Sequence, residues 1–280
     1  MNIDTIKQFE DKLKRKENKI SFSFGKNWQR YLESLSEDKI LSAKQSLTKF
    51  LGEPLKNKTF LDIGCGSGLF SYSAFLLGAK EITSFDIDPF SIQCAEFLRN
   101  QADNPKNWSV YYGSILDNDF ISKLKKHDIV YSWGVLHHTG KMWEAIRNST
   151  TLVKENGLLC IALYNKTKSS KIWLNIKRIY NIVPKLYKII MDWTYLLIYN
   201  FIVPLIKLQN PFRLTKEKAK IRGMSVLPDI RDWLGGYPFE YASVNEVEQF
   251  FKKLDQDFIL IKCTDIKTSA NNEYLFRKIE

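Results

Sequence analysis

The chain has 280 residues, of which 44% are apolar and 14% aromatic, ample for a buried core in one large domain or one domain with an insertion. Its four cysteines lie far apart and match no zinc spacing, so we interpret them as reduced thiols. The N-terminal stretch is polar and has no apolar signal region, which favours a cytoplasmic protein.

The positive charge is concentrated in one segment. The whole chain carries 42 Lys and Arg against 31 Asp and Glu, a formal charge of +11. Residues 165–222 contain 13 basic and two acidic side chains, so this segment alone accounts for +11 and the remainder sums to zero. A partner that is attracted by the positive charge should therefore bind at that segment.

Residues 1–57 are predicted to form a polar, helical N-terminal extension. Its apolar side chains follow helical spacing until Pro54 ends the pattern. Residues 58–165 then alternate short apolar strands with helices, which predicts an α/β fold with a doubly wound, mostly parallel sheet. The expected strands are 58–64, 81–87, 108–113, 127–134 and 157–165, and the expected helices are 69–78, 89–101 and 142–154.

The alternation stops over residues 166–242, which we interpret as an insertion. It resumes in residues 243–280 with a helix at 243–254, where Ser243 is the expected N-cap and Glu246 completes a capping box. Two strands, 257–266 and 272–279, follow. We expect the last strand to be part of the sheet.

A glycine loop joins the first strand to its helix. In "LDIGCGSG", Asp62 precedes glycines at 64, 66 and 68, a spacing that differs from the dinucleotide fingerprint. Glycine lets the backbone approach a ligand closely, and a carboxylate here suits a cationic ligand better than a pyrophosphate. Asp86 ends the second strand, where it can accept both hydroxyls of a ribose. We expect Asp88 to cap the next helix.

The motifs "LDIGCGSG", "SFDID", "YYGSILD" and "DIVYSWGVLHH" resemble those of class I S-adenosylmethionine-dependent methyltransferases, in the same order and at intervals that suit a sheet. The resemblance implies a seven-stranded sheet whose last strand is antiparallel, with S-adenosylmethionine as cofactor and S-adenosylhomocysteine as product. It implies that the cofactor binds along the strand ends. The residues implied are Asp62, Gly64, Cys65, Gly66, Gly68, Asp86, Ile87, Gly113, Ser114, Ile115, Ser132, Trp133 and Gly134.

The sequence departs from the family at one cofactor position. Many members carry an acid where Ser114 stands, so the polar contact to adenine would come from the backbone or from Asp117. In similar enzymes a segment such as "FGKNWQRYL" (24–32) covers the cofactor as a lid, which makes Trp28 and Tyr31 candidates for contacts.

The paired histidines of "YSWGVLHHTG" follow the fourth strand, at the edge of the sheet where α/β folds bind ligands. A histidine can take a proton from an acceptor hydroxyl, so His138, or else His137, is the candidate general base. The alternative is that one of them only caps the following helix. No carboxylate nearby has metal-ligand spacing, so we predict no metal.

The basic insertion contains a strongly apolar stretch, residues 185–208. Three interpretations stay open: cap helices over the active site, an interfacial helix on an anionic membrane, and a transmembrane helix, against which Asp192, Asn200 and Pro204 argue. Upstream, Ile172, Ile176, Ile179 and Val183 follow helical spacing, which places Lys171, Lys177 and Arg178 on the flanks of that helix.

Residues 221–243 form a loop rich in glycine and aromatic side chains that we expect to fold back over the pocket, as in a methyltransferase subgroup with the same motifs. The alternative is a structured connection ordered by its aromatics. The candidate acceptor contacts are Tyr164, Arg222, Trp233 and Tyr237, with Asp229 and Asp232 beside them.

The sequence therefore predicts methyl transfer from S-adenosylmethionine to a small-molecule, phosphorylated-sugar or lipid-linked acceptor, with oxygen as the acceptor atom. The basic, apolar insertion would suit peripheral contact with the inner face of an anionic membrane. Two alternatives are an RNA methyltransferase and a non-catalytic protein that binds the cofactor. The insertion is too apolar for a solvated nucleic-acid face, which makes a nucleic-acid partner the weaker hypothesis.

Overall fold

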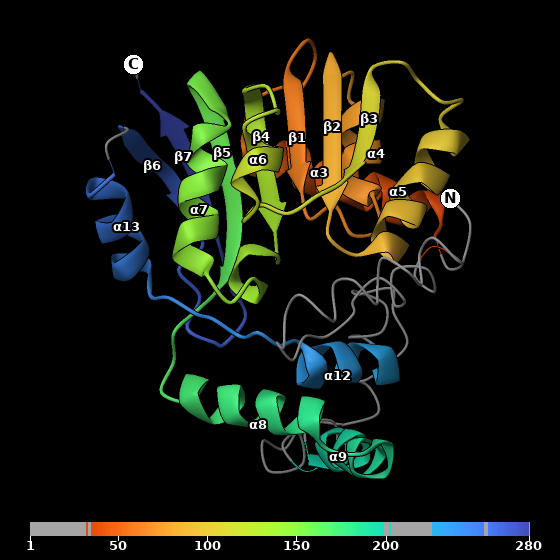
Figure 1. Cartoon of the computed structure of the whole chain (residues 1–280), viewed down its shortest axis with the longest axis vertical. Coiled ribbons are helices and arrows are strands. Elements are labelled where there is room, and N and C mark those ends of the chain that lie inside the picture. Colours follow the sequence, from red (N-terminus) through yellow and green to blue (C-terminus); the bar gives the residue numbers. More distant parts are fainter. Residues whose placement is uncertain (1–31, 33–34, 199–201, 203–225, 255–256, 280) are drawn as a thin grey trace.

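The computed structural model of the chain describes residues 32, 35–198, 202, 226–254 and 257–279. Its centre is a seven-stranded sheet in the order β3-β2-β1-β4-β5-β7-β6 (Figure 1). Strands β1 to β5 are parallel, and β7 runs antiparallel to both of its neighbours. The strands are β1 (Thr59–Ile63), β2 (Glu81–Asp86), β3 (Trp108–Tyr112), β4 (His127–Trp133), β5 (Val153–Tyr164), β6 (Phe258–Cys263) and β7 (Asn271–Lys278).

Helices cover both faces of the sheet, because successive side chains of a buried strand point to opposite sides. Phe60 belongs to one hydrophobic cluster with α3 (Glu37–Leu51), α4 (Leu69–Leu76) and α5 (Pro89–Gln101). Its neighbour Leu61 belongs to the other, with α6 (Asn118–Ile121), α7 (Met142–Thr151) and α13 (Val244–Lys252). The predicted doubly wound sheet is confirmed.

Local signals in the sequence set several boundaries. Asp88 caps α5 by accepting from the Phe90 N–H, and the capping box of Ser243 and Glu246 opens α13, both as predicted. The helix expected to reach residue 154 instead ends at Thr151, because Val153 already pairs with His127 as the first residue of β5.

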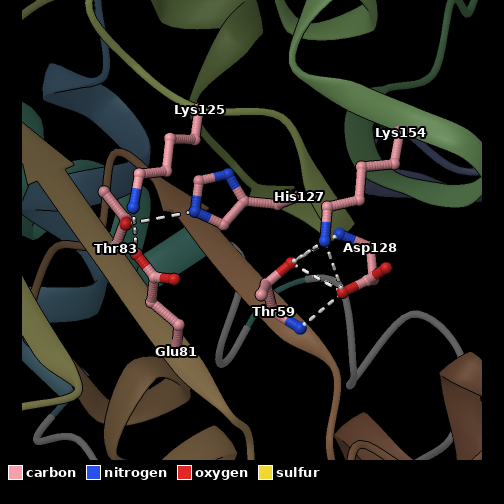
Figure 2. Close-up of polar contacts among 7 residues, drawn as sticks. All are labelled: Thr59, Glu81, Thr83, Lys125, His127, Asp128 and Lys154. Atoms are coloured by element: carbon pink, nitrogen blue, oxygen red, sulfur yellow. Dashed lines mark hydrogen bonds and ion pairs between the residues drawn. The ribbon is translucent and has the colours of Figure 1, made fainter.

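A polar cluster joins the strands at their amino ends (Figure 2). Asp128 accepts from the backbone N–H and hydroxyl of Thr59 and from Lys154. Burial raises the pKa of Asp128, but these hydrogen bonds outweigh it and bring the pKa to about 2. The third histidine, His127, is buried here and pairs with Thr83, at the opposite edge of the sheet from His137 and His138.

The insertion forms a cap beyond the carboxyl ends of the parallel strands, built in its described part from α8 (Ser170–Ile182), α9 (Lys185–Leu197) and α12 (Val226–Gly235) (Figure 1). Tyr180, Ile230 and Leu234 form its small buried centre. Asp192 is buried beside them, accepting from the Tyr180 hydroxyl at 2.7 Å and from Arg231 at 2.9 Å. None of the helices that the structure describes has the length and hydrophobicity that a membrane span requires.

The packing of α8 differs from the sequence expectation at Lys177. Ile172 and Ile179, on the apolar stripe, are 61% and 52% exposed, whereas Lys177, expected on the flank of that stripe, is fully buried. The prediction for Lys177 is wrong because helical periodicity locates an apolar face without stating which way that face points. The outer surface of α8 and α9 is consequently apolar.

Asp192 should stabilise the cap because it is the common partner of α8 and α12. We expect Asp192→Ala to leave the buried Tyr180 hydroxyl, and the exposed Arg231 guanidinium, without this acceptor and to lower the free energy of unfolding by about 1–3 kcal/mol. Chemical denaturation measures the loss, and amide exchange should localise it to α8, α9 and α12. Lys267→Ala removes an exposed ion pair with Asp265 and should cost less than about 0.5 kcal/mol. An equal loss in both variants would contradict this role.

Candidate active site

The glycine loop adopts a conformation that side chains resist. Gly64, Gly66 and Gly68 all have positive φ angles, of 69°, 54° and 77°. A Cβ at Gly64 would lie 2.4 Å from the Val135 side chain, and one at Gly68 would lie 2.7 Å from the Ala95 Cα. The loop can therefore pack between β4 and α5 only because these residues lack side chains, while Cys65 between them is buried.

Asp86 is bound to this loop directly. Its carboxylate accepts from the Gly66 N–H at 3.0 Å and from the Asp88 N–H at 2.8 Å. Burial raises the pKa of Asp86 to about 6, although these backbone hydrogen bonds favour the ionised form. The next residue, Ile87, is 51% exposed. The acid and the loop form one preorganised unit at the ends of β1 and β2.

Asp62 is held by a chain of hydroxyls that was not apparent from the sequence. The Trp108 indole N–H donates to Ser84, Ser84 pairs with Ser71, and Ser71 donates to Asp62 at 2.5 Å. Burial raises the pKa of Asp62 to about 7, with a further contribution from the negative charge of Asp86. A cation arriving beside these two acids would favour their ionised forms.

The loop after β3 uses its polar groups locally. Ser114 accepts from the Leu116 N–H, and Asp117 caps α6 by accepting from two backbone N–H groups through one oxygen. Ile115 is buried, and its carbonyl accepts from Asn148. Gly113 leaves the space that the Phe120 ring occupies, since a Cβ there would lie 2.3 Å from that ring.

The end of β4 passes from the core to the surface. Ser132 is buried and donates to the Ile63 carbonyl, which joins β4 to the end of β1. Trp133 is 45% exposed and donates to Glu273 on β7. Gly134 follows with a φ of 76°, and this turn directs the chain into the short helical turn η1 (Leu136–His138).

His138 lies in η1 with its tautomer determined by a hydrogen bond. Its Nδ1 is 2.6 Å from the Pro238 carbonyl, which can only accept, so Nδ1 carries the proton and the Nε2 of the neutral ring keeps its lone pair. Burial lowers the pKa of His138 to about 3, with the Pro238 bond opposing and Lys177 reinforcing the shift. The imidazole is therefore neutral near pH 7.

His137 is fully buried, and apart from the Ala162 backbone, which opposes the lowering of its pKa, its ring nitrogens have no polar partner of good hydrogen-bond geometry among the described residues. Its ring lies 4.0 Å from that of Tyr164 and 4.4 Å from that of His138, measured between centroids. Burial and the neighbouring His138 and Lys177 hold its pKa well below the ordinary value. A buried imidazole with so few good hydrogen bonds requires an explanation, and a bound water, ion or ligand is one.

The helix after the histidines is capped by a residue that sequence reasoning missed. Both carboxylate oxygens of Glu240 accept from the Met142 N–H at the start of α7, and the Glu240 N–H donates to the His137 carbonyl. The hypothesis that a histidine serves only as this cap is therefore not needed. No local pattern links residues 142 and 240, which lie 98 apart.

The predicted acceptor residues gather around the histidines where they are described. The Tyr164 ring lies 5.8 Å from that of Trp233 and 4.9 Å from that of Phe239. Tyr237 is half-buried in the same returning segment. Lys177, absent from the predicted set, places its Nζ among these rings. Arg222, Trp28, Tyr31 and the side chain of Asp229 lie outside the described residues.

The described acids and histidines form no group of three or more placed to hold a metal ion. The donor set at the strand ends instead suits a cofactor with a ribose and a cationic chain: a carboxylate at the last residue of β2, a second buried carboxylate near the end of β1, and a glycine backbone that a Cβ would obstruct. This sheet order and this site define a class I S-adenosylmethionine-dependent methyltransferase.

Comparison with known proteins agrees with the geometry. Residues 54–200 match the methyltransferase domain family. A ubiquinone biosynthesis O-methyltransferase from Pelagibacter ubique is 31% identical over 121 residues, which cover 43% of this chain and 48% of that protein. The chain spans about half the length of the curated relatives it matches. The chain belongs to the methyltransferase domain family, and its cofactor is S-adenosylmethionine.

Solved structures share the fold at low sequence identity. PKMT2 from Rickettsia typhi, solved in complex with AdoHcy, has a TM-score of 0.56 and 16% identity, over 84% of this chain and 52% of that chain. An S-adenosylmethionine-dependent methyltransferase from Mesorhizobium loti has a TM-score of 0.51 and 10% identity, over 84% and 97% of the two chains. These structures support the architecture described above.

Asp86 and Asp88 differ in role although they are two residues apart. We expect Asp86→Asn to weaken S-adenosylhomocysteine binding by about 10- to 100-fold, because the predicted acceptor for the ribose hydroxyls loses its charge. Titration calorimetry measures the affinity. Asp88→Asn keeps an N-cap of equal strength for α5 and should change the affinity less than about threefold. An equal loss in the two variants would refute the assignment.

Proposed function

We propose that this chain transfers the methyl group of S-adenosylmethionine to an oxygen of a small-molecule acceptor, with His138 as the general base. One observation carries the proposal. The hydrogen bond from His138 Nδ1 to the Pro238 carbonyl leaves Nε2 as the acceptor of the ring, beside the aromatic cluster at the carboxyl edge of the sheet. The curated relatives named ubiquinone biosynthesis O-methyltransferases support oxygen as the acceptor atom.

The cofactor-binding residues follow from the same proposal. Asp86 would accept from the ribose hydroxyls, and Asp62 with the glycine loop would hold the cationic amino acid portion. Gly113, Ser114 and Ile115 would border the adenine, and Ser132 to Gly134 would lie along the cofactor toward η1. The buried positions of Ser132 and Ile115 suit walls of the site, with backbone groups making the polar contacts.

The proposed reaction needs one proton transfer and one displacement. S-adenosylmethionine supplies a methyl carbon bonded to a positively charged sulfur. His138 Nε2 takes the acceptor's hydroxyl proton while Nδ1–H remains bound to the Pro238 carbonyl. The oxygen's electron pair forms the new carbon–oxygen bond, and the carbon–sulfur pair returns to sulfur. The imidazolium then releases its proton to solvent, which the low pKa of His138 favours.

The apolar outer face of the cap supports a proposal about its partner. Ile179, Leu186, Ile190 and Trp193 are each more than half exposed on α8 and α9, and residues 165–222 carry the net positive charge of the whole chain. Apolar and aromatic side chains among lysines are typical of helices that rest on an anionic bilayer. We propose that this face contacts such a membrane, which would give access to lipid-linked acceptors.

Substitution of His138 tests the base. His138→Asn can still donate to the Pro238 carbonyl but has no basic nitrogen. We expect it to lower kcat by about 10²- to 10⁴-fold, while S-adenosylhomocysteine affinity stays within about twofold. The measurement is transfer of labelled methyl to a panel of phenolic, sugar and lipid acceptors. Wild-type turnover in His138→Asn would rule out the base, and absence of transfer by a wild-type chain that binds the cofactor would favour a non-catalytic binder.

Vesicle flotation tests the membrane contact. We expect binding to vesicles of phosphatidylserine and phosphatidylcholine, but not to phosphatidylcholine alone, and weaker binding at high salt. Ile190→Glu combined with Trp193→Glu should reduce the bound fraction at least about fivefold. Ile261→Glu, at a 49% exposed isoleucine on β6, serves as the matched control and should bind normally. Self-association through this face instead of vesicle binding would contradict the proposal.

A further inference from the structure

Lys177 is the least expected side chain of the cap. It stands in the middle of α8, yet it is fully buried. Lysine is almost never fully buried unless it is paired, because desolvating an ammonium is costly. Its Nζ donates to the Trp233 carbonyl at the end of α12, and no ion pair between Lys177 and a carboxylate is found within the described part of the chain. The charge is thus buried with only partial compensation.

Three aromatic rings from separate segments surround this ammonium. The Nζ lies 4.1 Å from the centroid of Trp233, 4.9 Å from that of Phe239 and 5.8 Å from that of Tyr164. These distances permit cation–π attraction, which replaces part of the lost hydration. We call Lys177 with these three rings the lysine box. Because Tyr164 also contacts both histidines, the box borders the proposed base.

The box and its surroundings have more hydrogen-bond donors than acceptors. An ammonium has three N–H donors, and the Trp233 carbonyl is one acceptor. The indole Nε1–H of Trp233 is buried and has no partner among the residues described, and the neutral ring of His137 adds one further N–H beside it. Such unused donors beside a cation are satisfied best by an oxygen that carries negative charge.

Resting on the proposed function, we propose that the lysine box is the acceptor site and that Lys177 binds the reacting oxygen of a ring-bearing acceptor with an ionisable hydroxyl, of the phenol or enol class. Aromatic rings suit contact with a flat apolar body, and the ammonium suits the oxygen once its proton has left. A cation beside that oxygen makes its proton easier to remove.

The titrating groups around the box agree with this role. Burial lowers the pKa of Lys177 to about 7, and Asp232 on α12 opposes the shift. The other groups facing it are His137 and His138 on η1 and Tyr164 on β5. His138, with a pKa of about 3, is a weak base toward a free phenol, whose hydroxyl has a pKa near ~10. The positive charge of Lys177 lowers the pKa of a phenol bound beside it and so reduces the difference between that pKa and the pKa of His138.

The proposed methyl transfer remains balanced in protons and electron pairs when Lys177 takes part. The hydroxyl proton goes to His138 Nε2, and the resulting oxyanion pairs with the Lys177 ammonium. The oxygen then forms its bond to the methyl carbon, the carbon–sulfur pair returns to sulfur, and Lys177 remains an ammonium beside a neutral ether. The weak attraction between that ether and the ammonium favours release of the methylated product.

The test uses 4-nitrophenol as a probe, because its ionised form absorbs visible light and its neutral form does not. With the full chain and S-adenosylhomocysteine, we expect the bound probe to ionise at a pH at least about one unit below that of the free probe, a tenfold change in proton affinity. Lys177→Met should abolish the shift, and Lys177→Arg should retain most of it. Lys188→Met removes another cap lysine, one that lies over the Tyr180 ring, and should behave as wild type.

An unchanged shift in Lys177→Met, or no binding of the probe by wild type, would overturn the proposal. Should Lys177→Met fail to fold, ¹³C-lysine NMR of the wild-type chain decides instead: bound phenolate must raise the pKa of the lysine that titrates near pH 7, and no change would overturn it. Probe ionisation is independent of methyl transfer. Failure of transfer with an intact shift would therefore count against the proposed function and not against the acceptor site.

Discussion

The site depends on the return of the chain from the cap to the carboxyl edge of the sheet. Three hydrogen bonds hold that return: Pro238 accepts from His138, Glu240 donates to the His137 carbonyl, and the Glu240 carboxylate caps α7. The same few residues determine the tautomer of His138, fix η1 and place Phe239 among the rings. The cap is consequently joined to the catalytic edge through the segment that orients the proposed base.

Desolvation organises the charges of the two halves of the site in opposite senses. Around the glycine loop, burial raises the pKa values of Asp62 and Asp86, so these acids favour the arrival of positive charge. Around η1, burial lowers those of His138 and Lys177, so that half favours negative charge or a neutral base. A cationic donor on one side and an acidic acceptor on the other fit this polarity, since each charge neutralises its own surroundings.

The sequence was sufficient to predict the strands, the glycine loop and the caps at Asp88 and Ser243, because each leaves a recognisable pattern within a short stretch of the chain. It could not predict the hydroxyl chain to Asp62 or the cap by Glu240, since these contacts join strands and loops far apart. The prediction that Lys177 lies on the flank of its helix failed for a different reason. The apolar stripe of α8 was located correctly, but its direction depends on what covers the cap.

The inverted packing of α8 also bears on why a lysine occupies that position. An apolar residue such as methionine would fill the same volume among Trp233, Phe239 and Tyr164 without the cost of desolvating a charge. Cation–π contacts and one hydrogen bond return only part of that cost, as the lowered pKa of Lys177 shows. Stability alone therefore favours a different residue. A lysine here lowers the folding stability of the free enzyme, but its charge is compensated when an acidic oxygen is bound. The attraction between the ammonium and that oxygen is then strongest along the reaction path, where the oxygen is ionised.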